Sequence, residues 1–300
     1  MKALVVKNEE SESESANMLA VKREPEARSS SAPRSKSQLP CGVSDGRDKR
    51  WSIIFVPTFM SYLGTLEDPW HMDQSKTMKV LQAIWDVVYH DRPHVIESAS
   101  DVVFTICRQR SYEWRNKFLH HAQCHIETII KKNDWTTKGD RENIRDFVAE
   151  MLGGTYPFIF KQPHNAKTKG PFQSEFIAYV FSSHLQFVKD AARVKRVPLT
   201  ATHNPVGALT LASLACHRAL EAYATGSNTF MGRFSGESMA EETTYFSKSI
   251  LNLSEKTWSK IREESLKFVP AGLRRSSKAE VVVAAPVDQR PLIQDDEDSE

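Results

Sequence analysis

The stretch that decides the fold is VVFTICRQRSYEWRNKFLHHAQCHIETIIKK, residues Val102–Lys132. Within it, apolar and weakly polar residues recur at steps of three and four: Phe104, Cys107, Ser111, Trp114, Phe118, His121, His125 and Ile129. This spacing predicts one face of a long α-helix. A straight helix of this length measures about 48 Å at roughly 1.5 Å per residue, and a kink near His120 is an alternative. We expect its N-terminal cap at Ser98 or Ser100.

The composition of the chain changes at Trp51 and again after residue 268. Residues 1–50 combine alternating Glu and Ser with a Ser-Arg-Pro stretch, and residues 269–300 finish in acidic residues. Such segments bury too little apolar surface to offset the conformational entropy that folding removes. The sequence therefore predicts a disordered tail over 1–50, a single α-helical domain over 51–268 and a disordered acidic tail over 269–300.

Further helices are predicted on both sides of the long one. Their approximate ranges are 57–64, 73–90, 140–152, 172–196, 205–224 and 239–268, the last with a possible interruption at Asn252 or Ser254. Segment 205–224 is apolar nearly all round, which is typical of a central buried helix. Segment 156–160 has no partner strand in this pattern, so we expect a buried, extended connection, followed by a polar loop over 165–170. The predicted fold is an all-α, irregular or orthogonal bundle of about seven helices.

The overall composition narrows the possible partners. There are 40 Lys and Arg residues against 38 Asp and Glu, so the net field gives no reason to expect a strong nucleic-acid or anionic-membrane partner. The four cysteines show no paired spacing, as expected of thiols in a reducing compartment. No apolar run approaches the roughly 20 residues that cross a bilayer. We expect an intracellular protein without a membrane contact, with the nucleus favoured slightly over the cytoplasm.

Two pairs of possible metal ligands lie on the long helix. His121 and His125 are one turn apart, and so are His120 and Cys124. The two pairs project about 100° apart around the helix, and Cys107 is roughly 21 Å from His121, so they cannot complete one four-ligand site. The HExxH pattern is also absent. We therefore expect no metal and no cofactor, and keep His121 and His125 as the weak candidates for ligands on what is otherwise a core-facing side.

The same helix carries basic residues on its flanks. Arg108 and Arg115 share one flank, Arg110 and Lys117 the other, with aromatic side chains between them. This pattern allows a nucleic-acid contact surface. It equally fits a solvated helix boundary whose arginine stems cover the apolar seam, and the intervening Glu113 favours this second interpretation.

The common catalytic motifs are absent from the sequence. There is no P-loop, no Gly-x-Ser-x-Gly and no Gly-x-Gly-x-x-Gly. Glu67, Asp68 and Asp73 cluster around Trp70 and His71, which allows metal binding or acid–base chemistry, but a helix-entry loop rich in capping carboxylates explains them better. The adjacent pair His217-Arg218 is expected to pair with a neighbour on its helix. No catalytic residue is predicted.

Short interaction patterns occur in the predicted tails. The segment Val21-Lys22-Arg23-Glu24 matches the pattern apolar-Lys-x-Glu and resembles a sumoylation site. Lys22 is therefore a candidate for modification. Leu4-Val5-Val6 and Leu292-Ile293 each precede acidic runs and resemble segments that bind by adding a strand to a sheet. Residues 281–283 are a further candidate for a docking strand.

Several strings resemble one known family. They are Pro57-Thr-Phe59, Tyr62-Leu-Gly64, Asp68-Pro-Trp70, Arg218-Ala-Leu-Glu-Ala-Tyr223, Thr225-Gly226 and Phe234-Ser235. Together they are similar to a fungal family, abundant in basidiomycetes, that is classed only as a domain of unknown function. The resemblance covers about residues 51–268 and implies an all-helical intracellular domain, with no catalytic residue, cofactor or partner attached to it.

These observations favour a non-enzymatic interaction domain, with a nuclear or chromatin-associated role as one form of it and an unidentified protein as its partner. A nucleic-acid-binding protein, derived from a mobile element, that uses Arg108, Arg110, Arg115 and Lys117 is the first alternative. A metal-dependent enzyme built on His121 and His125 is the second. The sequence leaves the oligomeric state open.

Overall fold

The computed structural model describes residues 38–40, 43, 48–163, 169–195, 197 and 204–273. The chain divides into two compact units, Met1–Pro33 and Arg34–Glu300. The first lies wholly outside the described residues, and every helix and strand with described bounds belongs to the second. Lys22 and the other tail motifs, at 4–6, 281–283 and 292–293, also lie outside the described part.

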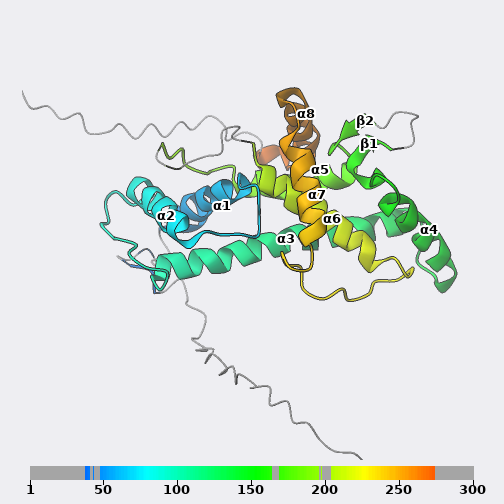
Figure 1. Ribbon diagram of the computed structural model, residues 1–300, viewed down its shortest axis with the longest axis horizontal. Helices are drawn as coiled ribbons and strands as arrows, with labels where there is room; N and C mark the ends of the chain where they lie inside the picture. The colour runs from blue at the N-terminus through cyan, green and yellow to red at the C-terminus, as the bar shows by residue number, and fades with distance from the viewer. Residues whose placement is uncertain are drawn as a thin grey trace, which may run out of the picture. The chain divides into compact units, whose positions relative to one another are not determined.

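Eight α-helices and one short hairpin make up the described structure (Figure 1). The helices are α1 Val56–Gly64, α2 Gln74–Val88, α3 Val102–Lys132, α4 Arg141–Leu152, α5 Glu175–Phe187, α6 Val206–Ala222, α7 Ala240–Leu251 and α8 Glu255–Leu266. A π-helical turn, Trp51–Phe55, precedes α1, and strands β1 (Phe160–Gln162) and β2 (Lys169–Pro171) pair antiparallel. The all-α prediction is confirmed.

Helix α3 is the long helix predicted from the sequence, and its bounds are Val102 and Lys132. It runs without interruption below α1 and α5 in the view of Figure 1. It packs against α1, α2, α5 and α6. Its cap is Asp101, whose side chain accepts a hydrogen bond from the Val103 amide, so the expectation of Ser98 or Ser100 was wrong. Asp101 lies nearer the first turn, and its carboxylate also meets His94.

Helix α6 is the buried centre of the bundle. Almost all of its residues are buried, because α1, α3, α4, α5 and α7 pack around it. Gly207 approaches α1 so closely that a Cβ there would lie 2.4 Å from the Leu66 carbonyl oxygen. At the far end, Gly226 adopts a φ of 83° against the Arg141 backbone, where a side chain would collide. The prediction of a central helix is confirmed.

Three segments differ from the sequence-based expectation. The segment 156–160 is not extended throughout, because Pro157–Ile159 form a 3-10 turn. Phe160 begins β1, which pairs with β2, where a loop was expected. Helix α5 ends at Phe187 rather than near residue 196. The region 239–268 is two helices, since the chain turns at Asn252 and Ser254 caps α8 by accepting a bond from the Thr257 amide.

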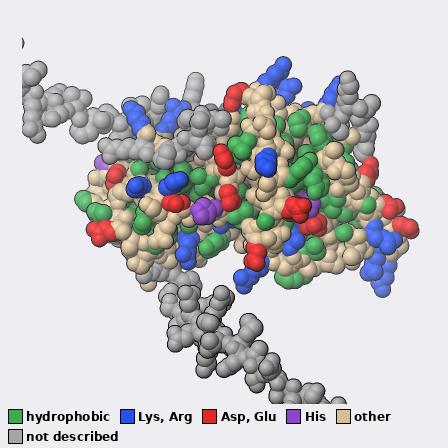
Figure 2. Space-filling model, in the orientation of Figure 1, with side chains coloured by type: hydrophobic (Ala, Val, Ile, Leu, Met, Phe, Trp, Pro, Cys, Tyr) green, Lys and Arg blue, Asp and Glu red, His purple; other side chains and the backbone are tan. Residues whose placement is uncertain are grey.

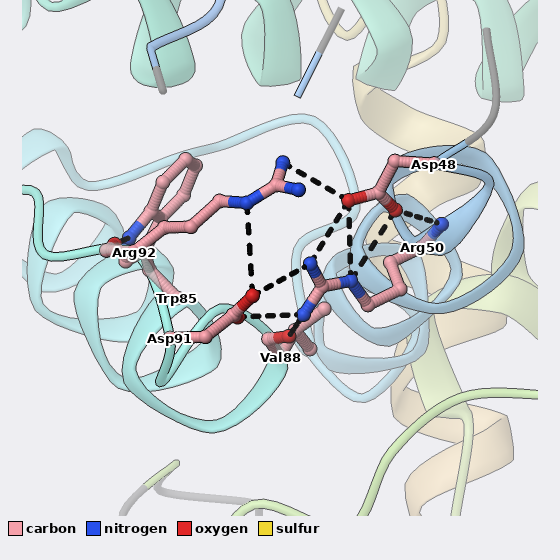
Figure 3. Close-up of polar contacts among 6 residues, drawn as sticks. All are labelled: Asp48, Arg50, Trp85, Val88, Asp91 and Arg92. Carbon is pink, nitrogen blue, oxygen red and sulfur yellow. Dashed lines mark hydrogen bonds and ion pairs between the residues drawn. The ribbon is translucent and has the colours of Figure 1, made fainter. Parts of the chain in front are cut away.

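Two residues before Trp51, Asp48 and Arg50, form ion pairs with Asp91 and Arg92, which follow α2 (Figure 3). Arg50 lies between Asp48, 2.9 Å away, and Asp91, 2.7 Å away, and donates to the Val88 carbonyl oxygen at the end of α2. Arg92 pairs with Asp48 at 3.0 Å. Hydrogen bonds from Arg50 lower the pKa of Asp91 to about 2. This network joins the chain ahead of α1 to the C-terminal end of α2.

No helix in the described residues is long and apolar enough to cross a membrane.

Candidate functional site

The two histidines singled out on α3 face the aromatic side of α5. The His125 ring stacks on Tyr179 at 4.7 Å between ring centroids and lies 5.0 Å from Phe176. His121 is half-buried and 6.0 Å from the same Tyr179 ring. Both histidines therefore belong to the seam between α3 and α5, as the core-facing interpretation of this helix side predicted.

Burial sets the charge state of these rings. Desolvation lowers the pKa of His125 below its usual 6.5, and it lowers the pKa of His121 in the same direction. A buried imidazole in contact with aromatic rings is neutral at physiological pH. In this neutral state, the imidazole packs against the rings of α5 as a flat, weakly polar side chain.

An open pocket of about 330 Å³ lies beside His125. It is enclosed by the C-terminal half of α3, the end of α4, the segment from Pro157 into β1 and the start of α5. Its apolar lining consists of Ile129, Phe147, Met151, Pro157, Phe158, Phe160, Pro163 and Phe176, and its polar lining of His125, Thr128, Lys132, Asn133, Ser174 and Glu175. The walls are mainly apolar, and the exposed side chains of Thr128, Lys132 and Glu175 stand at the rim.

The polar groups of this pocket have local roles. Ser174 caps α5 by accepting a bond from the Ile177 amide at 3.1 Å. Thr128 and Asn133 donate to carbonyl oxygens one turn back on α3. Their hydrogen-bonding capacity is used largely within their own helices, so the pocket has an apolar floor and no converging set of acid, base and nucleophile.

The described residues contain no group of three or more His, Cys, Asp or Glu side chains placed to hold a metal ion. His121 and His125 share their surroundings with Tyr179 and Phe176 rather than with a third ligand. His120 and Cys124 form a separate pair, 3.7 Å apart, at the outer side of the helix.

The four basic residues of α3 have different environments. Arg115 is buried: its Nε donates to the Pro69 carbonyl oxygen at 2.9 Å, and its Nη2 to that of Trp70 at 3.3 Å. Arg110 pairs with Glu113 at 2.5 Å, and the Lys117 ammonium lies 5.0 Å from the Phe187 ring centroid. Arg108 is exposed. Arg115 is thus engaged inside the fold, and the two flanks do not form one continuous basic surface.

The loop that Arg115 contacts contains Asp68-Pro-Trp70, one of the segments that resemble the known family, and it lies against a second such segment at Phe234. Trp70 Nε1 donates to Thr243 Oγ1 on α7 at 2.9 Å, and its ring meets Phe234 edge-on at 5.0 Å. Asp68 accepts bonds from the Trp70 and His71 amides within the loop. Asp73 caps α2 by accepting a bond from the Lys76 amide, as the interpretation of this loop as a helix entry predicted.

The second predicted pair, His217-Arg218, also serves its own neighbourhood. His217 Nδ1 lies 3.6 Å from Glu221, and the contacts with His217 and Arg218 lower the pKa of Glu221. Arg218 donates to the Met231 carbonyl oxygen in the loop after α6. As predicted, both residues pair with neighbours.

Sequence reasoning found His125 but missed the rest of the pocket. Phe147 and Met151 lie in the helix predicted over 140–152, and Phe158 and Phe160 lie in the segment expected to be a buried, extended connection. The pocket exists because that connection turns. Tyr156 adopts a left-handed φ of 59° before Pro157, which redirects the chain toward the end of α3. The Gly153-Gly154 pair ahead of it was the available signal of such a turn.

The family match covers most of this architecture. The family described as a domain of unknown function (DUF6532) matches residues 57–250, from the start of α1 to the end of α7. The chain belongs to the DUF6532 family. No curated protein and no solved structure matches it. The DUF6532 region includes His125 and the whole lining of the pocket beside it, whereas α8 and the pair Asp48–Arg50 lie outside the region.

Proposed function

We propose that this DUF6532 protein is a non-enzymatic, intracellular interaction domain, and that it binds a protein partner by accepting an apolar side chain in the pocket beside His125. The observation that supports this most is the lining: eight apolar side chains around one opening, with a neutral imidazole as part of the wall.

The size of the pocket supports a side chain rather than a whole cofactor. Sites for drug-sized ligands hold roughly 300–1,000 Å³, and a volume of about 330 Å³ is at the lower limit of that range. Protein interfaces commonly concentrate their binding energy in one or two apolar anchors that fill such a pocket. The exposed Lys132 and Glu175 at the rim supply the polar border that these interfaces usually have.

The experiment selects partners without assuming one. A random peptide library is displayed against the folded protein, and enriched peptides are measured by fluorescence anisotropy. We expect them to share one large apolar residue and to bind at least about tenfold more weakly to Thr128→Trp, because the new indole fills the pocket from its rim.

Asn116→Trp is the matched control, since Asn116 is an exposed residue of the same helix that does not line the pocket. Binding to it is expected to be unchanged, with both variants melting like the wild type. Selected peptides that bind Thr128→Trp as well as wild type, or that share no apolar residue, contradict the proposal.

A further inference from the structure

A second pocket, of different chemistry, lies between the β1–β2 hairpin and α8. Its volume is about 590 Å³. The lining consists of Lys161, Gln162, Lys169, Gly170, Pro171, Gln173, Lys256, Thr257, Lys260, Glu263 and Glu264. Four ammonium groups thus surround one hollow together with two carboxylates. Figure 2 shows Lys and Arg side chains projecting at the α8 end of the molecule.

The carboxylate of Glu264 already forms ion pairs with two lysines. Lys161 lies 2.5 Å from one oxygen of Glu264, and Lys267, from just beyond the pocket, lies 2.6 Å from the other. Hydrogen bonds from these two lysines lower the pKa of Glu264. Lys169, Lys256 and Lys260 have no carboxylate within ion-pair distance among the residues that the structure describes. The pocket therefore keeps an excess of positive charge for an anionic group.

The same chain carries an anionic segment of the right size. Residues 295–300 are DDEDSE, five carboxylates within six positions. Roughly 20 residues separate this segment from Leu273, close after α8, and a chain of that length can span up to about 70 Å. Residues of α8 from Lys256 to Glu264 line the pocket. A segment tethered beyond the C-terminal end of α8 is therefore long enough to reach it.

We propose that the acidic segment 295–300 binds in the lysine pocket between the β1–β2 hairpin and α8 of its own chain. Charge complementarity selects this occupant, because the acidic residues match Lys169, Lys256 and Lys260. Tethering raises its local concentration to the millimolar range, which compensates for the small contribution of each exposed ion pair. When bound, the segment covers these lysines and keeps other polyanions away from them. This inference is independent of the apolar pocket.

Lysine acylation tests the proposal on the full chain. The acylation rates of Lys169, Lys256 and Lys260 are followed by mass spectrometry at low salt, with the exposed Lys79 of α2 as internal reference. Neutralising the segment with Asp295→Asn, Asp296→Asn, Glu297→Gln and Asp298→Asn is expected to raise the three rates about threefold. The difference is expected to disappear near about 0.5 M salt, where charges are screened.

The chain offers a charge-matched control. Glu9→Gln, Glu10→Gln, Glu12→Gln and Glu14→Gln remove the same number of carboxylates from the other acidic run. They are expected to leave the rates unchanged. Equal rates in wild type and in the 295–298 variant, or an equal increase in both variants, overturn the proposal.

Carbodiimide crosslinking of a mixture of ¹⁴N- and ¹⁵N-labelled protein identifies where the segment binds. We expect bonds between residues 295–300 and Lys256 or Lys260 within one isotope. If a second copy supplied the segment, mixed-isotope crosslinks would make up about half of the total, as random pairing of equal amounts of the two labelled chains requires, and this result overturns binding in the same chain. Duplex DNA that protects these lysines equally in wild type and in the 295–298 variant would indicate a nucleic-acid site that the segment does not occupy, and also overturns it.

Discussion

Strand β1 separates two pockets of opposite character. Phe160 lines the apolar pocket beside His125, and its neighbour Lys161 lines the lysine pocket beside α8. Successive side chains of a strand point to opposite faces, so adjacent residues of one short strand contribute to both. The comparison shows how a single strand supplies an apolar wall to one site and a cation to the other.

The two pockets depend on the fold in different ways. The walls of the apolar pocket include Phe158 and Phe176, which are buried and belong to the core of the bundle. The lysine pocket is built from side chains with solvent-exposed ammonium groups on α8 and the hairpin. Changes to the buried walls of the first should therefore alter the stability of the protein, whereas changes to the second should alter binding and salt dependence.

The largest effect is expected from Phe176→Ala on the wall of the apolar pocket. Phe176 is 6% exposed and contacts His125, so truncation removes buried apolar area and enlarges the cavity. The free energy of unfolding should fall by about 3 kcal/mol, measured by urea denaturation. Leu251→Ala, at a position 43% exposed, is the control and should cost no more than about 0.5 kcal/mol. Equal losses in the two variants would contradict the assignment of this wall to the core.

The fold was largely predictable because its main helices have strong local patterns. The periodic residues of Val102–Lys132 and the nearly continuous apolar run that became α6 both specify a buried helix without knowledge of the neighbours. The hairpin was not predictable in this way. Its strands have three residues each, and the partner β2 contains Gly170 and Pro171, which are rare in strands.

The candidate site was predictable only where it lies on α3. The spacing of His121 and His125 placed them on one face, and the absence of a third ligand nearby argued for packing over metal binding. The walls from α4 and β1 depend on the turn at Tyr156, and no helical or strand period encodes a left-handed backbone at a tyrosine. The lysine pocket joins residues about 100 positions apart, such as Lys161 and Glu264, so its assembly depends on the tertiary fold.

A smaller effect is expected from pH, acting through His125. Its pKa is lowered in the folded state, so the unfolded chain binds a proton more readily. The contribution of the neutral His125 ring to the free energy of unfolding is fully present above the unfolded pKa near 6.5. It is lost as pH falls through that value toward the folded pKa. His125→Phe removes this loss, so its stability should fall less than that of the wild type between pH 7 and pH 5.

The stability of the wild type should fall further than that of His125→Phe as pH approaches 5, measured by urea denaturation across the range. His184, whose burial lowers its pKa to about 3, is present in both proteins and cancels in the comparison. His120→Phe, on the exposed side of α3, should follow the wild-type curve. Parallel curves for wild type and His125→Phe would show that protonation of this ring is not linked to unfolding.

The smallest effect on stability is expected in the lysine pocket, from Lys256→Ala combined with Lys260→Ala. Neither residue has an ion-pair partner among the described residues, and both lie on the outer side of α8, so the free energy of unfolding should change by less than about 0.5 kcal/mol. Lys161→Ala is the informative contrast, because it breaks the pair with Glu264 and should cost up to about 1 kcal/mol at low salt and less at high salt. If the double variant were the more destabilised of the two, the lysines of α8 would be part of the folded framework, and the distinction between a structural pocket and a charged binding pocket would fail.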